Sequence, residues 1–318
     1  MTVCVAALAA AGRAIVCIAD KALSYGDYIQ WDSDSSKIIT LNPSGSLVMV
    51  SGDEEPVSRV LAHLTAVGGD IGGKPLADTI LLVEQQYAKA VDELVFAKLI
   101  RPRQLTRDEY IRALTAPGEN HIIRALADEV SRFSLECTVL VCGFDDRDEA
   151  FILSVGTPGV AINMTGTGFH AIGSGWDKAV SKLLFAEHKR DHDIDRVLYD
   201  AFDAKANAEM AIGVGYEWDA TLVLGGTYGS QDVPKTIKEL LEKVWSKYNR
   251  SPFEKFDPKE HWSIPKNWRK QLWEYCYSNV VERMKAHVGT IPPTLELIDF
   301  SVKNSAKPSD SQTSEGPQ

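Results

Sequence analysis

The sequence predicts an α+β fold in which two stacked, mainly antiparallel sheets carry pairs of helices on both outer faces, a four-layer αββα sandwich. Three observations lead to this fold class. Short apolar runs of strand length come in clusters, pairs of amphipathic helices separate these clusters, and single strands and helices do not alternate along the chain. The clustering excludes a doubly wound parallel sheet, which requires that alternation.

Four strands are expected at the start of the chain. Residues 2–8 and 14–20 are two apolar runs around Gly12, which is typical of a hairpin whose strands are both buried. Residues 36–42 and 46–51 repeat the pattern around a Pro-Ser-Gly turn.

The middle of the chain is expected to be helical. Apolar residues recur at helical spacing over 54–67 and 76–100, and the segment 104–133 fits two shorter helices separated by Pro117 and Gly118. The second half of the pattern consists, in chain order, of strands over 137–144, 150–155 and 163–173, helices over 175–187 and 193–212, and a strand over 219–226.

The character of the chain changes after residue 230. We assign residues 1–230 to the sandwich domain, with an insert at about 101–133, and residues 231–302 to a tryptophan-rich, mainly helical extension. Helices are expected over 232–249 and 266–287 and a half-buried strand over 294–302, and residues 303–318 have the composition of a disordered tail.

Composition excludes several classes of function. The 318 residues carry a net charge of -10, which argues against a nucleic-acid partner, because phosphates attract a basic surface. No segment has the roughly 18 uninterrupted apolar residues of a membrane span. The five cysteines form no C-x-x-C pair, so we expect reduced thiols in a cytoplasmic protein without a metal site.

Thr2 is the first residue that carries chemistry. It follows the initiator methionine and begins a buried strand, and its small side chain favours removal of Met1. The free α-amine, with a pKa near 8, would then lie beside its own hydroxyl and accept the hydroxyl proton while Oγ1 attacks a carbonyl.

Three further residues are expected at the same edge of the sheet. Asp20 ends the second strand, Lys37 begins the third and Gly52 ends the fourth, and antiparallel strands bring such positions together. A lysine ammonium about 4 Å from the Thr2 hydroxyl, at an effective dielectric of about 20, favours the alkoxide by roughly 4 kcal/mol. The backbone N–H at the strand-to-helix junction of Gly52 is a candidate donor to a tetrahedral oxyanion.

This pattern resembles the proteasome β-subunit family of N-terminal-nucleophile hydrolases. The opening MTVCVA is most similar to the bacterial Anbu-type members, and the HslV-type peptidases are a second relative. The resemblance covers residues 2–65 well and resumes over 137–187, where VLVCGFDDRDEAFILSV and AIGSGWDKAVSKLL match the family's central hairpin and its Gly-Ser-Gly.

The resemblance assigns a role to six residues. It implies that Thr2 is the nucleophile, that Asp20 and Lys37 tune it and that Gly52 donates to the oxyanion. Ser174 of the Gly-Ser-Gly would lie beside the Thr2 amine, and Glu209 best matches the family's helix-borne carboxylate. The serine expected three residues after that carboxylate is Ile212 here, which is a departure from the family pattern.

The function implied is that of a threonine-type peptidase that works through an acyl-ester and needs neither a metal ion nor an organic cofactor. The resemblance also implies a homo-oligomeric ring or spiral that encloses its active sites, takes peptides or unfolded proteins, and is open to an ATP-dependent unfoldase as partner. Two alternatives stay open. One is a catalytically inactive structural subunit, and the other is a small-molecule amidase whose pocket the insert at 101–133 would close.

Two weaker sequence patterns are not used in this assignment of function. GTGFHAIGSG has the composition of a phosphate-binding loop but lacks its Gly-Lys-Ser/Thr ending. His188 and His192 lie four residues apart and would share a helix face as a metal pair. Because they occur in the charge run HKRDHD at a helix boundary, we assign them instead to a solvated turn.

Overall fold

The computed structural model describes residues 2–25, 29–32, 36–116, 121–226, 228–248, 271 and 274–275. Its strands are β1 (Cys4–Ala9), β2 (Ala14–Asp20), β3 (Ala22–Tyr25), β4 (Ile29–Asp32), β5 (Ile38–Thr40), β6 (Leu47–Gly52), β7 (Cys137–Phe144), β8 (Ala150–Gly156), β9 (Val160–Asn163), β10 (Phe169–Ile172), β11 (Trp218–Leu224) and β12 (Gly229–Asp232). Its α-helices are α1 (Glu54–Ala66), α2 (Leu76–Val95), α3 (Arg107–Thr115), α4 (His121–Ser131), α5 (Trp176–Phe185), α6 (Ile194–Ala208) and α7 (Lys235–Tyr248).

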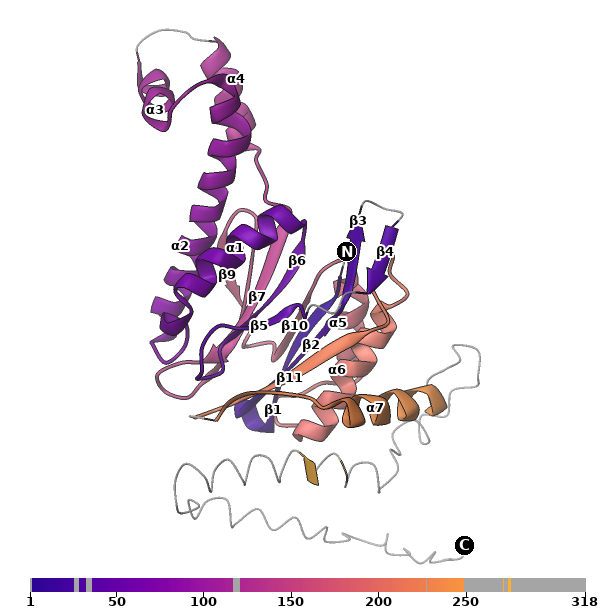
Figure 1. Ribbon diagram of the computed structural model, residues 1–318. Coiled ribbons are helices and arrows are strands. Elements are labelled where there is room, and N and C mark those ends of the chain that lie inside the picture. The colour runs from indigo at the N-terminus through magenta and orange to yellow at the C-terminus, as the bar shows by residue number, and fades with distance from the viewer. Residues whose placement is uncertain are drawn as a thin grey trace, which may run out of the picture.

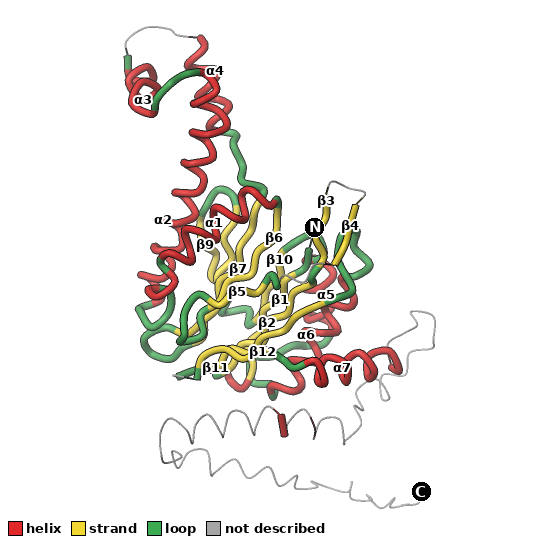
Figure 2. Tube along the Cα trace, viewed as in Figure 1, coloured by secondary structure: helices red, strands yellow, loops and turns green. Residues whose placement is uncertain are grey.

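Two five-stranded antiparallel sheets form the middle of the molecule. The first has the strand order β10-β1-β2-β11-β12 and the second the order β5-β6-β7-β8-β9. Helices α5 and α6 cover the outer face of the first sheet, and α1 and α2 cover that of the second (Figures 1 and 2). The predicted α+β class and its four-layer αββα order are confirmed.

Strand β1 shows why the opening apolar run is uninterrupted. Val3, Val5 and Ala7 pack in one core with α5, α6 and α7, whereas Cys4 and Ala6 pack in a second core between the two sheets. Side chains alternate between the two faces of a strand. Because both faces are buried, every position of β1 must be apolar, and none of these side chains is exposed to solvent.

The second sheet is buried in the same way. Its outer face packs against α1 and α2 around Tyr87, whose hydroxyl donates to the carbonyl of Cys137 at 2.8 Å. This bond satisfies the one polar atom of a fully buried aromatic side chain. None of the helices in the described ranges combines the length and apolar character that crossing a bilayer requires.

Three features differ from the sequence-based expectations. A separate hairpin, β3–β4, follows Asp20, and β12 extends the first sheet after β11. The expected strand over 163–173 is in fact a crossing point, because β9 ends in the second sheet and β10 begins in the first. The chain reverses between them through a turn in which Gly168 donates to the carbonyl of Met164, with φ at +83°.

The insert forms a small helical unit of its own. Helices α3 and α4 pack around Val95, Ile100, Tyr110 and Leu126 at the far end of α2, away from the sheets (Figure 1). The expected break between these helices, at Pro117 and Gly118, lies outside the described residues.

The chain after residue 226 continues into the main core. Strand β12 spans residue 230, and α7 buries Ile237, Leu241 and Val244 in the same core as α6. Residues 271 and 274–275 are helical, as expected for 266–287. The remainder of that helix, the strand expected over 294–302 and the tail over 303–318 lie outside the described residues.

The cysteines of the described ranges, Cys4, Cys17, Cys137 and Cys142, are all free and buried. Burial raises the pKa of Cys4 and of Cys137 to about 12, and it raises the pKa of Cys17 well above its ordinary value. These thiols therefore stay protonated at physiological pH, and a thiol reacts as its thiolate.

We expect iodoacetamide at about pH 8 to leave these four cysteines unmodified in the folded protein, because all four are buried away from the reagent and because Cys4, Cys17 and Cys137 stay protonated. Peptide mapping by mass spectrometry after alkylation, with and without denaturant, measures this. Modification of Cys4 in the folded protein would contradict the expected burial. Cys276 lies outside the described residues and is not part of the expectation.

Candidate active site

Thr2 lies at the start of the first sheet, two residues before β1 begins, and is buried at 3% exposure. Its carbonyl oxygen accepts hydrogen bonds from the Gly175 backbone N–H at 3.3 Å and from Ser174 Oγ at 3.4 Å. Gly173 has φ at +95°, and a Cβ atom there would lie 2.2 Å from that same oxygen. The Gly-Ser-Gly segment therefore wraps closely around the Thr2 backbone because it has no side chain at Gly173.

Asp20 is the last residue of β2 and is fully buried. The pairing of β1 with β2 sets Cys4 opposite Ala19, which brings Asp20 beside Val3 and Thr2. Its Oδ1 accepts from the Thr2 hydroxyl and from the Val3 backbone N–H at 2.8 Å.

The second oxygen of Asp20 is also satisfied. Oδ2 accepts from the backbone N–H groups of Ala22 at 3.2 Å and Gly215 at 3.0 Å. A buried carboxylate is stable only when it is paired and hydrogen-bonded, and Asp20 meets both conditions.

Lys37 precedes β5 at the edge of the second sheet. Its Nζ donates to the Thr2 hydroxyl oxygen and lies 3.0 Å from Asp20 Oδ1, and its side chain is 11% exposed. The Thr2 hydroxyl thus donates to Asp20 and accepts from Lys37 at the same time. Such an arrangement polarises the hydroxyl and stabilises negative charge on Oγ1.

Gly52 ends β6, two residues before α1 begins. Its φ is +129°, and a Cβ atom there would lie 2.2 Å from the carbonyl oxygen of Glu136, so only glycine fits. Two residues earlier, the Val50 carbonyl accepts from Cys4 Sγ at 3.6 Å, which puts the end of β6 across from the start of β1. The proposed role of Gly52 as an oxyanion donor stays a prediction.

Glu209, which follows α6, pairs with a residue that the sequence analysis missed. The Nζ of Lys205 donates to Glu209 Oε1 at 2.6 Å and to the Tyr216 carbonyl at 2.6 Å, and Lys205 is fully buried. The spacing of four residues along a helix was the available signal. Burial raises the pKa of Glu209, although the charge of Lys205 acts in the opposite direction.

The segment 209–216 is consequently held at several points. Lys205 binds it at both ends, Gly215 donates to Asp20, and the Ile212 carbonyl accepts from Ser174 Oγ at 3.3 Å. The side chain of Ile212, at the position where the resemblance implies a serine, is 76% exposed.

The structure thus brings together Thr2, Asp20 and Lys37, with Ser174 on the Thr2 carbonyl. Glu209 lies outside this group and forms an ion pair with Lys205. Cys4 also lies beside this group, but burial keeps its pKa at about 12, and the opposing effect of the nearby Lys37 is smaller. Cys4 is therefore not a competing nucleophile at neutral pH.

No family model and no curated protein matches the sequence. Among solved structures, the chain matches Anbu (ancestral beta-subunit) from Yersinia bercovieri at 12% identity and a TM-score of 0.52, covering 80% of this chain and 99% of that one. It also matches eukaryotic HslV from Trypanosoma brucei at 15% identity and a TM-score of 0.42, covering 69% and 98% respectively. The likeness to the Anbu structure shows a shared fold, and the predicted resemblance is borne out at that level.

We expect Glu209→Gln to lower the free energy of unfolding by about 3 kcal/mol, because it removes the carboxylate that pairs with the buried Lys205 ammonium. Lys205→Met combined with Glu209→Gln should recover much of that loss, because neither charge of this pair then remains. Urea denaturation of the two single variants and the double variant measures both effects. Additive losses in the double variant would show that the two side chains do not depend on each other.

Proposed function

We propose that the protein is a threonine-type peptidase or amidohydrolase that uses Thr2 as its nucleophile after Met1 is removed. The observation that carries the proposal is the Thr2 hydroxyl held between the carboxylate of Asp20 and the ammonium of Lys37. The fold shared with the Anbu structure supports this proposal, because the resemblance from which Thr2 was assigned as nucleophile implies that fold.

The first chemical step forms a tetrahedral intermediate. The α-amine of Thr2 takes the hydroxyl proton while Oγ1 attacks the carbonyl carbon of the substrate. Lys37 stabilises the developing alkoxide, and Asp20 neutralises Lys37 and orients the hydroxyl. In this proposal the Gly52 backbone N–H donates to the tetrahedral oxyanion.

The second step releases the product. The protonated amine of Thr2 passes its proton to the leaving amine, the C–N bond breaks, and the acyl group stays on Oγ1. In a third step the same amine takes a proton from water, which attacks the ester carbonyl. The amine then returns that proton to Oγ1 as the ester C–O bond breaks, which releases the carboxylic acid and restores the threonine. Ser174 would keep the N-terminal residue in place through its bond to the Thr2 carbonyl.

A second candidate is a catalytically inactive subunit of the same fold. The observation that favours it is the pairing of Glu209 with Lys205 together with Ile212 at the serine position, because the family uses those two groups to hold the N-terminal amine. The small-molecule amidase has less support. It requires the insert to close a pocket over Thr2, whereas α3 and α4 pack around their own core at the far end of α2 (Figure 1).

We expect the purified protein with a native N-terminus to lack one methionine and to gain one covalent adduct with an epoxyketone, a reagent that reacts with both the hydroxyl and the amine of an N-terminal threonine. The intact mass before and after incubation measures this. Thr2→Ala should lose Met1 but form no adduct, whereas Thr2→Ser should still form one.

The other possible results of this mass measurement would change the functional assignment. Met1 retained, or Met1 lost without an adduct, would contradict the peptidase and support the inactive subunit. An adduct accompanied by turnover of short acyl-amides but not of peptides would support the amidase.

We further propose a homo-oligomeric ring or spiral in the cytoplasm, with peptide or unfolded-protein substrates and an ATP-dependent unfoldase as a possible partner. The free, buried cysteines support a reducing compartment. The exposed apolar side chains of Leu184 and Phe185 at the end of α5, at 61% and 72%, support burial against another subunit.

Size-exclusion chromatography with light scattering should therefore give a mass several times 35.0 kDa at micromolar concentration. Leu184→Lys combined with Phe185→Lys should reduce that mass, because charged side chains are depleted from the core of an interface. A monomer mass for the unmodified chain across this range would contradict the oligomer without touching the chemistry at Thr2.

A further inference from the structure

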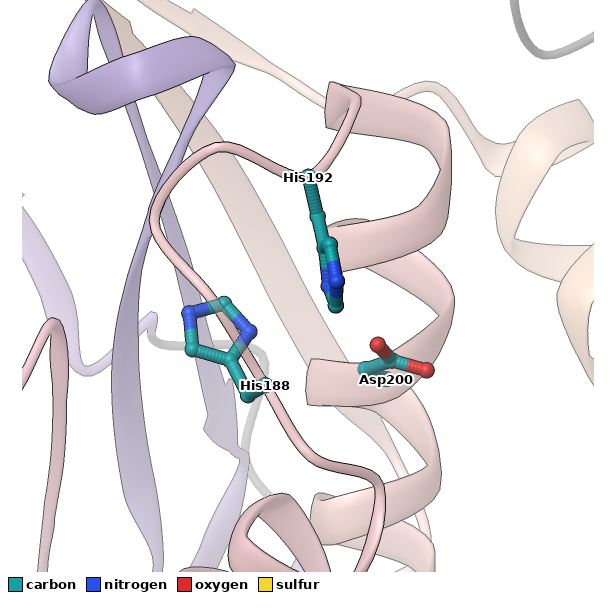
Figure 3. A group of neighbouring side chains, drawn as sticks. All are labelled: His188, His192 and Asp200. Atoms are coloured by element: carbon teal, nitrogen blue, oxygen red, sulfur yellow. The ribbon is translucent and has the colours of Figure 1, made fainter.

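The turn between α5 and α6 gathers two histidines and a carboxylate at one place. His188 and His192 lie in the turn and Asp200 lies in α6, and the ring of His192 lies between the other two side chains (Figure 3). The His192 carbonyl accepts from the Ala10 backbone N–H at 2.8 Å, which places the group at the end of β1 opposite Thr2. The six residues of β1 span about 20 Å, so this group is separate from the candidate active site.

The prediction of a solvated turn is wrong for His188. Its side chain is 9% exposed, because the turn folds back onto β1 and onto Phe169, whose ring meets the His188 ring edge to face at 5.4 Å. Neither ring nitrogen of His188, nor Nδ1 of His192, has a hydrogen-bond partner of normal geometry among the described residues, although the backbone carbonyl groups of Leu8 and Gly168 lie near the His188 ring. Buried polar atoms without a partner are costly and rare, and a bound ion would satisfy one nitrogen of each ring.

The arrangement matches the demands of a small cation. One donor atom from each of the three residues lies within 4.8 Å of the others. In a tetrahedral zinc site with bonds of about 2.1 Å the ligand atoms are about 3.4 Å apart. Closing the three side chains by about an ångström through χ rotation would complete the contacts.

We propose that His188, His192 and Asp200 bind one divalent transition-metal ion such as zinc, and that this ion links the α5–α6 turn to helix α6. Two imidazole nitrogens and one carboxylate oxygen are a donor set that suits zinc, and a water molecule would complete the tetrahedron.

Arg196 completes the surroundings of this group. Its Nε donates to Asp200 Oδ2 at 2.9 Å, which orients the carboxylate and leaves Oδ1 for the ion. The same guanidinium places a positive charge close to the ion. The hydrogen bond positions Asp200 for the ion while the charge opposes the ion, so these two effects of Arg196 act in opposite directions and the test rests on the ligands themselves.

The experiment uses untagged, full-length protein that has been stripped with a chelator and dialysed against micromolar Zn²⁺. Elemental analysis should find one zinc per chain, and Co²⁺ in its place should give the visible absorption bands of a tetrahedral site. His192→Gln should weaken zinc binding roughly 10-fold or more. His121→Gln, which removes an exposed histidine at the start of α4, should leave it unchanged.

Circular dichroism of each variant separates misfolding from loss of a ligand, and the cobalt spectrum of the unmodified chain needs no variant at all. The proposal is overturned if the unmodified chain binds no stoichiometric zinc, or if His192→Gln, folded, binds zinc as the unmodified chain does.

Discussion

The carboxylate of Asp20 is the constraint on which the arrangement around Thr2 depends. It is completely buried, and an ionised group in that position is tolerated only when donors surround it. The donors come from four separate parts of the chain, namely the start of β1, the turn after β2, Lys37 before β5, and Gly215 in the loop after α6. One charge therefore fixes both sheets and the α6 loop relative to the Thr2 hydroxyl.

Parts of this structure that depend on local sequence were predictable. The uninterrupted apolar runs of β1 and β2 indicate burial on both faces, and the antiparallel pairing of these strands brings Thr2 and Asp20 together. Lys37 precedes β5 in the second sheet, so it reaches Thr2 through the stacking of the two sheets, which strand pairing alone does not predict. The structure of the segment 163–173 was not predictable. The chain leaves the second sheet at the end of β9 and enters the first sheet at β10, and no local sequence pattern specifies with which sheet a strand pairs.

The pairing of Glu209 explains the main gap in the predicted site. A family pattern can align a carboxylate with a position, but it does not say which cation the folded chain brings to it. Here that cation is Lys205, one helical turn earlier. The alanines around Lys205 give this stretch the pattern of an ordinary helix, which does not indicate a buried lysine. Buried ion pairs of this kind are set by packing, which periodicity alone does not reveal.

The backbone and the side chains of the loop over residues 209–216 have different roles. Its backbone supports Asp20 and Ser174, while its side chains Met210, Ile212 and Tyr216 project outward at 71%, 76% and 76% exposure. Evolution can therefore exchange these three side chains without moving the backbone donor that Asp20 needs. The outward surface of this loop is thus a place that selection, or a protein engineer, can alter while the contacts of Asp20 and Ser174 stay unchanged.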